Sequence, residues 1–379
     1  MKINFSLYGM IKGLLVTFSD KDERTLKARR NIFFSFIIKA LNILIGLLLV
    51  PITITYLDQT KYGVWITLSS IIGWFGFFDI GLGNGLRNKF AEALAAGKHD
   101  LAKVYVSTTY AILTIAILFV LLVFAAINPF LNWSVILNTD QEPVFESELS
   151  QLALIVFTFF CLSFIFKLIT TILIADQRPA KSSLFDLIGK IISLILIYIL
   201  TLLTKGSLLY LGIVMSATPV LVLIISSFWF FKKTYKTYRP SIRSIDFTKA
   251  KDLFGLGIKF FIIQISAVVL YQTNNMIIAH LFGPAQVTPY NIAFKYFSVL
   301  MMFFSIIVTP FWSAFTEAWV KKELIWIKKT MRKLFKMWGL LALCGVLMLV
   351  FSEQIFKIWI SDLVNIPFSI SCLIMIWVL

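Results

Sequence analysis

Ten apolar runs, most of them long enough to cross a lipid bilayer, constrain this chain more than any other feature. A membrane-spanning helix needs about 20 predominantly apolar residues. Hydrophobic residues make up 59% of the sequence and charged residues 14%, whereas a soluble domain has about 25% charged residues. We therefore expect an all-α polytopic membrane protein. Its predicted spans are residues 32–56, 64–86, 104–127, 151–175, 183–204, 207–231, 253–282, 289–314, 334–352 and 366–379.

Basic residues are concentrated in alternate connections between these runs. Most of the 35 Lys and Arg residues lie in the N-terminal segment and in the second, fourth, sixth and eighth connections. Cytoplasmic loops of membrane proteins carry such an excess, so the pattern predicts a cytoplasmic N-terminus. It also explains the net charge of +16 by membrane topology. We therefore expect no nucleic-acid partner.

The longest basic connection divides the chain into two similar parts. Residues 232–252 follow the sixth predicted span and form a basic cytoplasmic linker. Before it, residues 32–231 are expected to form an N-terminal six-helix bundle, and after it residues 253–379 form a C-terminal bundle. Residues 1–31 are too charged next to the first span to be a cleavable signal, so they are expected to form an interfacial segment. No basic residue follows the last run, and we expect the second bundle to be incomplete in this chain.

The second apolar run contains the polar stretch FFDIGLGNGLRNKF. A phosphate-binding loop would need a preceding strand and a helix whose N-terminus faces the anion, but an apolar run of helical length precedes this stretch. We predict instead one long helix that continues to Gly97, in which Gly81, Gly83 and Gly85 allow neighbouring helices to approach closely. Asp79 would then lie within the membrane, where a carboxylate either faces a cavity or pairs with a lysine.

Five lysines lie inside predicted spans. A lysine costs about 3 kcal/mol at the centre of a span, and less where its side chain reaches the interface. For Lys167 and Lys190 we favour such snorkelling or pairing, because an aspartate lies one turn before Lys190. For Lys39, Lys259 and Lys295 we favour a cationic cavity. Fixed ammonium groups near the inner leaflet would suit an anionic headgroup such as a lipid pyrophosphate.

Two later spans carry polar or helix-bending residues. The seventh span contains Gln264 and Asn275, which should face the protein interior, with hydrogen bonding between helices as the alternative. The eighth span contains Pro310, which can kink the helix at a moving part of a carrier. Cysteines number three and histidines two, without metal-ligand spacing. We therefore expect no metal site, no disulfide and no cofactor.

Two blocks, residues 29–98 and 272–319, carry the most distinctive patterns of the chain. In the first block, Tyr62-Gly63 opens the second helix and Asp-Ile-Gly-Leu follows at residues 79–82. The chain resembles the polysaccharide repeat-unit flippases (O-antigen or capsule translocases) of the multidrug/oligosaccharidyl-lipid/polysaccharide exporter superfamily. Relatives often carry an aspartate in the second block where this chain has asparagine, which removes a protonatable group there.

The resemblance implies a MATE-like carrier of two six-helix bundles in the bacterial inner membrane. Such a carrier is a transporter and not an enzyme. It moves undecaprenyl-pyrophosphate-linked oligosaccharide repeat units from the cytoplasmic to the periplasmic leaflet by alternating access. Its cavity is lined chiefly by the first, second, seventh and eighth helices. The residues of this chain expected to bind substrate there are Lys39, Arg87, Lys259, Gln264, Asn275 and Lys295.

The resemblance also implies partners. Asp79 would couple transport to a proton or sodium ion, or hold a lysine in an ion pair. Membrane lipids, a polysaccharide polymerase and assembly proteins are the further expected partners.

Two alternatives stay open at this stage. A drug exporter, or an exporter of another lipid-linked substrate, could share the superfamily, although exporters of cationic drugs need intramembrane carboxylates and here lysines predominate. A membrane enzyme of polysaccharide assembly is the alternative from a different class. A polymerase should have a large external loop with arginines, and the longest predicted external loop, residues 128–150, has none.

Overall fold

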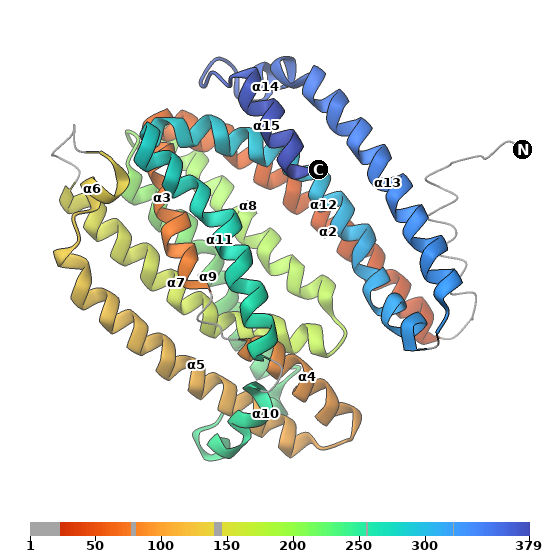
Figure 1. Ribbon diagram of the computed structural model, residues 1–379. Helices are drawn as coiled ribbons and strands as arrows, with labels where there is room; N and C mark the ends of the chain where they lie inside the picture. The colour runs from red at the N-terminus through yellow and green to blue at the C-terminus, as the bar shows by residue number, and fades with distance from the viewer. Residues whose placement is uncertain (1–22, 77–80, 140–145, 255–256, 321) are drawn as a thin grey trace, which may run out of the picture.

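The computed structural model describes residues 23–76, 81–139, 146–254, 257–320 and 322–379, and these residues form helices joined by turns, with no strand in the described ranges (Figure 1). The first-half helices are α2 (Glu23–Leu57), α3 (Gln59–Trp74), α4 (Leu82–Ala95), α5 (His99–Ile127), α6 (Trp133–Leu137), α7 (Glu146–Ala175), α8 (Pro179–Leu203), α9 (Leu208–Lys232) and α10 (Ala250–Phe254). The remaining helices are α11 (Gly257–Phe282), α12 (Pro284–Val320), α13 (Leu324–Val350), α14 (Ser352–Ile360) and α15 (Phe368–Val378).

The helices are those of a multi-pass membrane protein, which confirms the predicted all-α polytopic fold. Within the described residues, 6 helices are long and apolar enough to cross a bilayer. These candidate spans are Ile37–Leu57, His99–Phe130, Glu148–Ala175, Pro179–Leu203, Leu208–Lys232 and Leu324–Val350. The shorter α15 is also strongly apolar.

The predicted continuous helix through the glycine-rich stretch is wrong. Helix α3 ends at Trp74 and α4 begins at Leu82. Gly81 precedes α4 with φ 72°, in the left-handed region, which an α-helix cannot accommodate in its interior. The expected stop near Gly97 agrees with the end of α4 at Ala95 and with φ 67° at Gly97. Asp79 lies outside the described residues.

The first helix extends beyond the predicted first span. Helix α2 begins at Glu23, whereas the apolar candidate span within it is Ile37–Leu57, close to the predicted residues 32–56. The first turns of this helix contain a glutamate, a lysine and arginines. A helix can continue outside the bilayer, so these charged residues need not lie within the membrane. The interfacial helix predicted within residues 1–31 falls mostly outside the described residues.

The buried apolar residues form two cores. The first draws on α2 to α10 and includes Phe157, whose ring stacks on Phe124 at 3.9 Å and meets Phe75 edge-on at 4.9 Å. The second core combines α12, α14 and α15 with Val50 and Ile54 of α2. We call α2 to α10 the first group and α11 to α15 the second group. Helix α2 therefore contributes side chains to both cores.

The predicted linker is folded onto the first group. The backbone N–H of Ser241 donates to Ser107 Oγ at 3.1 Å, and that of Asp246 donates to Thr108 Oγ1 at 3.0 Å. The hydroxyl of Tyr235 donates to Asp176 Oδ2 at 2.8 Å. Leu253 of α10 is fully buried. We call the end of the molecule that carries the linker, α4 and α10 the linker end.

At the opposite end, the start of α3 contacts the junction of α11 and α12. Gln59 Nε2 donates to the Ala285 carbonyl at 3.0 Å, and Thr288 Oγ1 donates to the Gln59 carbonyl at 2.6 Å. A Cβ at Gly63 would overlap the carbonyl oxygen of Pro284, so only glycine allows this approach. We call this set of contacts, Gln59 and Gly63 with Pro284, Ala285 and Thr288, the seal.

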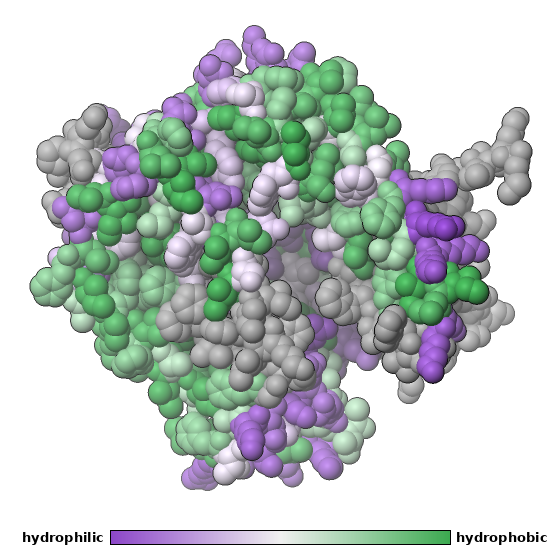
Figure 2. All heavy atoms as spheres, in the orientation of Figure 1, coloured by the Kyte–Doolittle hydropathy of each residue, from purple (hydrophilic) through white to green (hydrophobic). Residues whose placement is uncertain are grey.

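Three helices diverge from the linker end. Helices α2, α12 and α13 run to the lower right in Figure 1, away from α4, α5 and α10 at the bottom, whereas α11 of the second group stays in contact with α4 and α10. The space-filling view shows the surface hollowed between these regions (Figure 2). The described structure is therefore closed at the seal and hollowed between α12 and α13 on one side and the linker end on the other.

Candidate functional site

Two intramembrane lysines belong to different groups. Lys190 is on α8 and Lys295 is on α12, and we call them the lysine pair; Asp186 acts more strongly on Lys190 than Lys295 does. Lys295 Nζ donates to the Tyr62 hydroxyl at 3.0 Å and lies 5.7 Å from the centroid of the Tyr62 ring. Lys190 Nζ donates to the backbone carbonyl of Asn42 at 3.4 Å. Both ammonium groups are thus held by neutral oxygens from the first group.

The positive charge of this region exceeds its negative charge. Asp186, one turn before Lys190, attracts both Lys190 and Lys167. The ion pairs within 4.0 Å in the described ranges are Lys61–Asp58, Lys89–Glu92 and Arg178–Asp176, and none includes these intramembrane lysines. Ammonium groups in apolar surroundings are costly unless an anion accompanies them. The lysine pair is therefore a favourable position for an anionic group.

Helix α2 borders the same region through Asn42. The amide of Asn42 donates to the Ile38 carbonyl at 3.1 Å and to the Ser183 carbonyl of α8 at 3.4 Å. Its Oδ1 is buried without a hydrogen-bond partner among the described residues. Lys39 lies one turn before Asn42, and its side chain is exposed. The structure thus places the predicted Lys39 on the helix that contacts Lys190.

Asn275 makes a contact between helices in this structure. It is 6% exposed, and its amide donates to Ser70 Oγ of α3 at 2.8 Å. Its Oδ1 is buried and has no hydrogen-bond partner in the described ranges. This geometry matches the interhelical hydrogen bonding considered as the alternative for this residue. Substrate binding by Asn275 stays a prediction.

The other predicted residues are more distant or not described. Arg87 is exposed on α4, at the linker end. Lys259 and Gln264 lie on α11 and Pro310 lies on α12, but their side chains fall outside the described part of the chain. Helix α12 continues through Pro310 to Val320. Their predicted roles in binding and in kinking therefore remain predictions.

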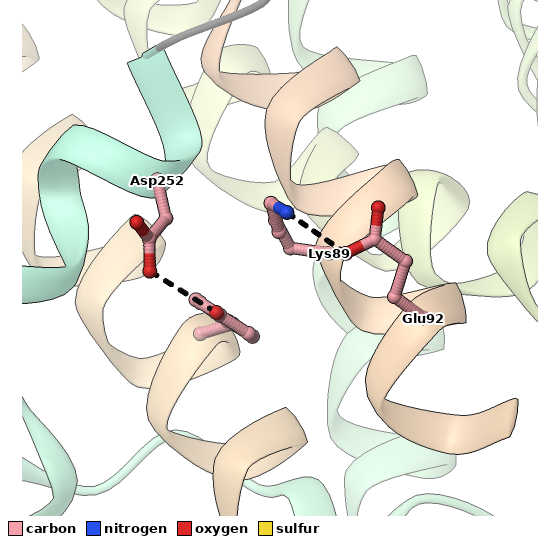
Figure 3. A network of polar contacts seen from close by, with 4 residues as sticks. Lys89, Glu92 and Asp252 are labelled. Carbon is pink, nitrogen blue, oxygen red and sulfur yellow. Dashed lines mark hydrogen bonds and ion pairs between the residues drawn. The ribbon is translucent and has the colours of Figure 1, made fainter. Parts of the chain in front are cut away.

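The glycine-rich stretch contributes a close contact at the linker end. A Cβ at Gly85 would overlap the backbone carbonyl oxygen of Leu253, so the backbones of α4 and α10 are in direct contact here. Next to this contact, the Tyr105 hydroxyl donates to Asp252 Oδ2 at 3.3 Å, and Lys89 Nζ pairs with Glu92 Oε2 at 2.8 Å (Figure 3). The hydrogen bond and the charge of Glu92 raise the pKa of the Lys89 ammonium.

Two hollows lie apart from the lysine pair, on α13. One, of about 350 Å³, is apolar and lies between α12 and α13; it is lined by Phe304, Val308, Phe315, Met331, Leu334, Phe335 and Trp338. The other, of about 600 Å³, is basic and is lined by Ile325, Lys328, Lys329, Arg332, Lys333 and Lys336. Neither contains a residue that the sequence predicted to bind substrate.

Sequence reasoning assigned Lys190 to snorkelling or to pairing with Asp186, and it did not single out Tyr62 or Asn42 as site residues. The attraction of Lys190 by Asp186 agrees with the pairing. The sequence does not show that Tyr62 reaches Lys295 or that the Asn42 carbonyl reaches Lys190, because these contacts depend on which helices are neighbours.

Comparison with known proteins gives a family and two similar curated proteins. A family model described as "Polysaccharide biosynthesis protein" matches residues 28–316. A "Putative O-antigen export protein" of Yersinia pseudotuberculosis is 22% identical over 259 residues, which are 66% of this chain and 56% of the relative. A "Putative O-antigen transporter" of Salmonella typhimurium is 26% identical over 258 residues, which are 65% of this chain and 55% of the relative. The chain thus spans a little over half the length of these relatives.

Solved structures of multidrug transporters share the fold. An inward-facing multidrug resistance MATE family transporter of the MOP superfamily superposes with a TM-score of 0.70 at 14% identity, covering 92% of this chain and 79% of that one. An outward-facing conformation of a transporter described in the same words gives a TM-score of 0.60 at 14% identity, covering 92% of this chain and 78% of that one. At this identity the likeness establishes a MATE-like fold.

Proposed function

The chain belongs to the polysaccharide biosynthesis protein family, and from this membership we propose that it transports lipid-linked oligosaccharide repeat units across the bacterial inner membrane. The substrate would be an undecaprenyl-pyrophosphate-linked unit, moved from the cytoplasmic to the periplasmic leaflet. Two curated relatives are named for O-antigen export and transport, which supports a polysaccharide-related cargo and a carrier in place of an enzyme. The MATE-like fold supports alternating access.

The observation that carries this proposal is the lysine pair between the two groups. A pyrophosphate bears several negative charges, and charge-assisted hydrogen bonds from ammonium groups are about twice as strong as neutral ones. The hydrogen bonds of Lys190 and Lys295 go to neutral oxygens, and Asp186 attracts Lys190, so an anionic headgroup would offer Lys295 in particular a stronger partner. We propose that this pair receives the pyrophosphate together with Lys39 and Lys259. Arg87, Gln264 and Asn275 would contact the cargo along the path.

The shape of the molecule supports loading from the cytoplasm. The linker end carries the basic connections, which the positive-inside rule places in the cytoplasm. The described structure is closed at the seal, and its surface is hollowed between α12 and α13 on one side and the linker end on the other (Figure 2). Its TM-score is also higher with the inward-facing transporter, 0.70, than with the outward-facing one, 0.60. We propose that the structure represents the state that accepts substrate from the inner leaflet.

A genetic complementation experiment tests the proposal. The gene is deleted in its host, and the deletion is complemented with wild type, with a Lys190→Gln/Lys295→Gln variant, or with a Lys328→Gln/Lys329→Gln control on α13. Surface polysaccharide, lipid-linked intermediates and protein abundance are measured. We expect the deletion and the first variant to lose polymer and to accumulate a complete lipid-linked repeat unit. The control variant should restore polymer.

Two outcomes would contradict the proposal. Full polymer from the Lys190→Gln/Lys295→Gln variant at normal abundance would remove the lysine pair from the transport path. An incomplete repeat unit in the deletion strain, lacking a sugar or acyl group, would indicate an enzyme that acts before translocation. Coupling to a proton or sodium ion, and association with a polymerase, remain proposals that these measurements leave open.

A further inference from the structure

We infer that Tyr62 is a positioning residue that links occupation of the lysine site to opening of the seal. The inference rests on the proposed function, because it requires an anionic headgroup to bind beside Lys295. Tyr62 lies in the first turn of α3, between the seal residues Gln59 and Gly63, and is 2% exposed. Its hydroxyl accepts the hydrogen bond from Lys295. One side chain therefore touches both the seal and the site.

An anion at the lysine pair would compete with Tyr62 for Lys295. A phosphate oxygen is a stronger acceptor than a neutral phenol, because both partners in the new hydrogen bond are charged. Lys295 has one described side-chain hydrogen-bond partner, Tyr62, and can exchange it for the anion. Lys295 then turns from α3 towards the bound anion. The hydrogen bond that connects α12 to the first turn of α3 is then lost.

Further contacts hold the two groups together at this end. Gln59 donates to the Ala285 carbonyl and accepts from Thr288, Gly63 packs against Pro284, and α3 packs on both α11 and α12. Asn138 Nδ2 also donates to the Ala279 and His280 carbonyls of α11. Loss of the hydrogen bond to Tyr62 therefore weakens the closed arrangement without removing its other contacts.

Asn275 of α11 packs against α3 further along that helix. Its Oδ1 is buried without a hydrogen-bond partner in the described ranges, which raises the free energy of the closed arrangement. A ligand shifts a conformational equilibrium only through its different affinity for the two states. Here the anion binds more tightly when the seal is open, because Lys295 is then released from Tyr62.

The test measures how readily a cysteine placed beside the seal becomes accessible to a maleimide. Val287, next to Thr288 on α12, is fully buried and is replaced by cysteine in the full chain, with Cys161, Cys344 and Cys372 changed to serine. The protein is purified into lipid nanodiscs, and the rate of maleimide labelling is measured with farnesyl pyrophosphate or with farnesol as the uncharged probe. We expect farnesyl pyrophosphate to raise the rate about tenfold, the factor that corresponds to one charged hydrogen bond, and farnesol to have no effect.

Three variants in this background separate coupling from general loosening. Gly63→Ala adds a Cβ that overlaps Pro284, so it should label rapidly without any probe and serves to validate the reporter. Tyr62→Phe keeps the ring but removes the acceptor, so it should label faster than wild type without probe and gain less than twofold from farnesyl pyrophosphate. Tyr296→Phe removes a hydroxyl that donates to the Met348 carbonyl at 3.1 Å, away from the seal, and should respond as wild type.

Binding of farnesyl pyrophosphate, measured by calorimetry on the same samples, distinguishes failure of the coupling from failure of the proposed anionic site. If the wild-type protein binds the probe and labelling does not rise, the coupling is wrong and the proposed function stands. A normal response in Tyr62→Phe would equally overturn the coupling. If the wild-type protein does not bind the probe at all, the proposed anionic site fails and this inference fails with it. Support requires unchanged or tighter binding to Tyr62→Phe together with loss of its response.

Discussion

The two groups of helices differ in how completely they bury their surfaces. In the first group, between 17% and 44% of the most apolar stretch of each candidate span is buried, whereas in the second group only 6% of that of α13 is buried. The first group also holds the linker through backbone hydrogen bonds, while the core of the second group depends on side chains from α2 and on Tyr62. The first group therefore has a core of its own, whereas the core of the second group is completed by side chains of the first.

This difference matters because lipid does not drive helices together. Association of helices in a bilayer depends on close packing and hydrogen bonds, since lipid tails are as apolar as leucine side chains. Changes to tight contacts should therefore be costly in the first group, and comparable changes on α13 should be tolerated. The following four predictions compare the two groups, or two kinds of contact within the first, by the free energy of unfolding in mixed detergent micelles.

The largest effect is expected from truncating a ring in the first core. Phe157 is fully buried against Phe124 and Phe75, and Phe157→Ala should lower the free energy of unfolding by about 3 kcal/mol through the cavity it leaves. The matched change in the second group is Phe335→Ala on α13, where the side chain is 64% exposed. It should cost less than about 0.5 kcal/mol. Equal losses for the two variants would show that the groups do not differ in packing.

The next effect concerns two glycines. Gly85→Ala forces α4 and α10 apart at Leu253 and should cost about 2 kcal/mol, within the range for overpacking. Gly339 of α13 has no atom within 4 Å of the position of a Cβ, and Gly339→Ala should stabilise its helix by up to about 1 kcal/mol. A neutral Gly85→Ala would mean that the linker end is looser than its contacts indicate.

A smaller effect is expected at the hydroxyl that binds the linker. Tyr105→Phe removes the hydrogen bond to Asp252 and should cost about 1 kcal/mol. Backbone amides of residues 250–254 should exchange with solvent faster in this variant. Tyr198→Phe is the control, because Tyr198 is 56% exposed on α8. Unchanged exchange in Tyr105→Phe would indicate that packing of Leu253 alone holds α10.

The smallest effect is expected from the most prominent ion pair in Figure 3. Lys89 and Glu92 approach to 2.8 Å, but their side chains are 29% and 63% exposed. An exposed pair three residues apart contributes about 0.5 kcal/mol or less. Lys89→Gln and Glu92→Gln should each stay within this limit, and raising the salt concentration should remove the difference from wild type. A loss above about 1 kcal/mol would show that the pair is effectively buried.

The fold could be predicted from the sequence to the extent that it depends on local pattern. Apolar runs and basic connections predicted an all-α polytopic chain, and the matched family model confirms the family resemblance. The break before α4 was missed because the glycines of this polar stretch were assigned to helix packing, whereas Gly81 adopts a left-handed backbone conformation. The basic composition of the linker likewise concealed Tyr235, whose burial depends on contacts with distant helices.

The candidate site was predictable only in part for the same reason. Lys295 was identified because a lysine in an apolar run is unusual wherever the helix lies. Tyr62 joins it, and Asn42 contacts Lys190, through packing between helices far apart in sequence, at separations that no periodic pattern records. The roles predicted for Lys259, Gln264, Pro310 and Asp79 stay predictions.

The contact between Gly85 and Leu253 has a consequence for the order in which the protein is made. Leu253 belongs to the first core, so that core has all of its members once residue 254 has been synthesised. Domains generally fold as units, with N-terminal parts first during synthesis. The first group can therefore close before most of the second is translated, leaving Val50 and Ile54 uncovered on α2 until α12, α14 and α15 arrive. The first group, folded during synthesis, would then provide the surface on which the second group packs.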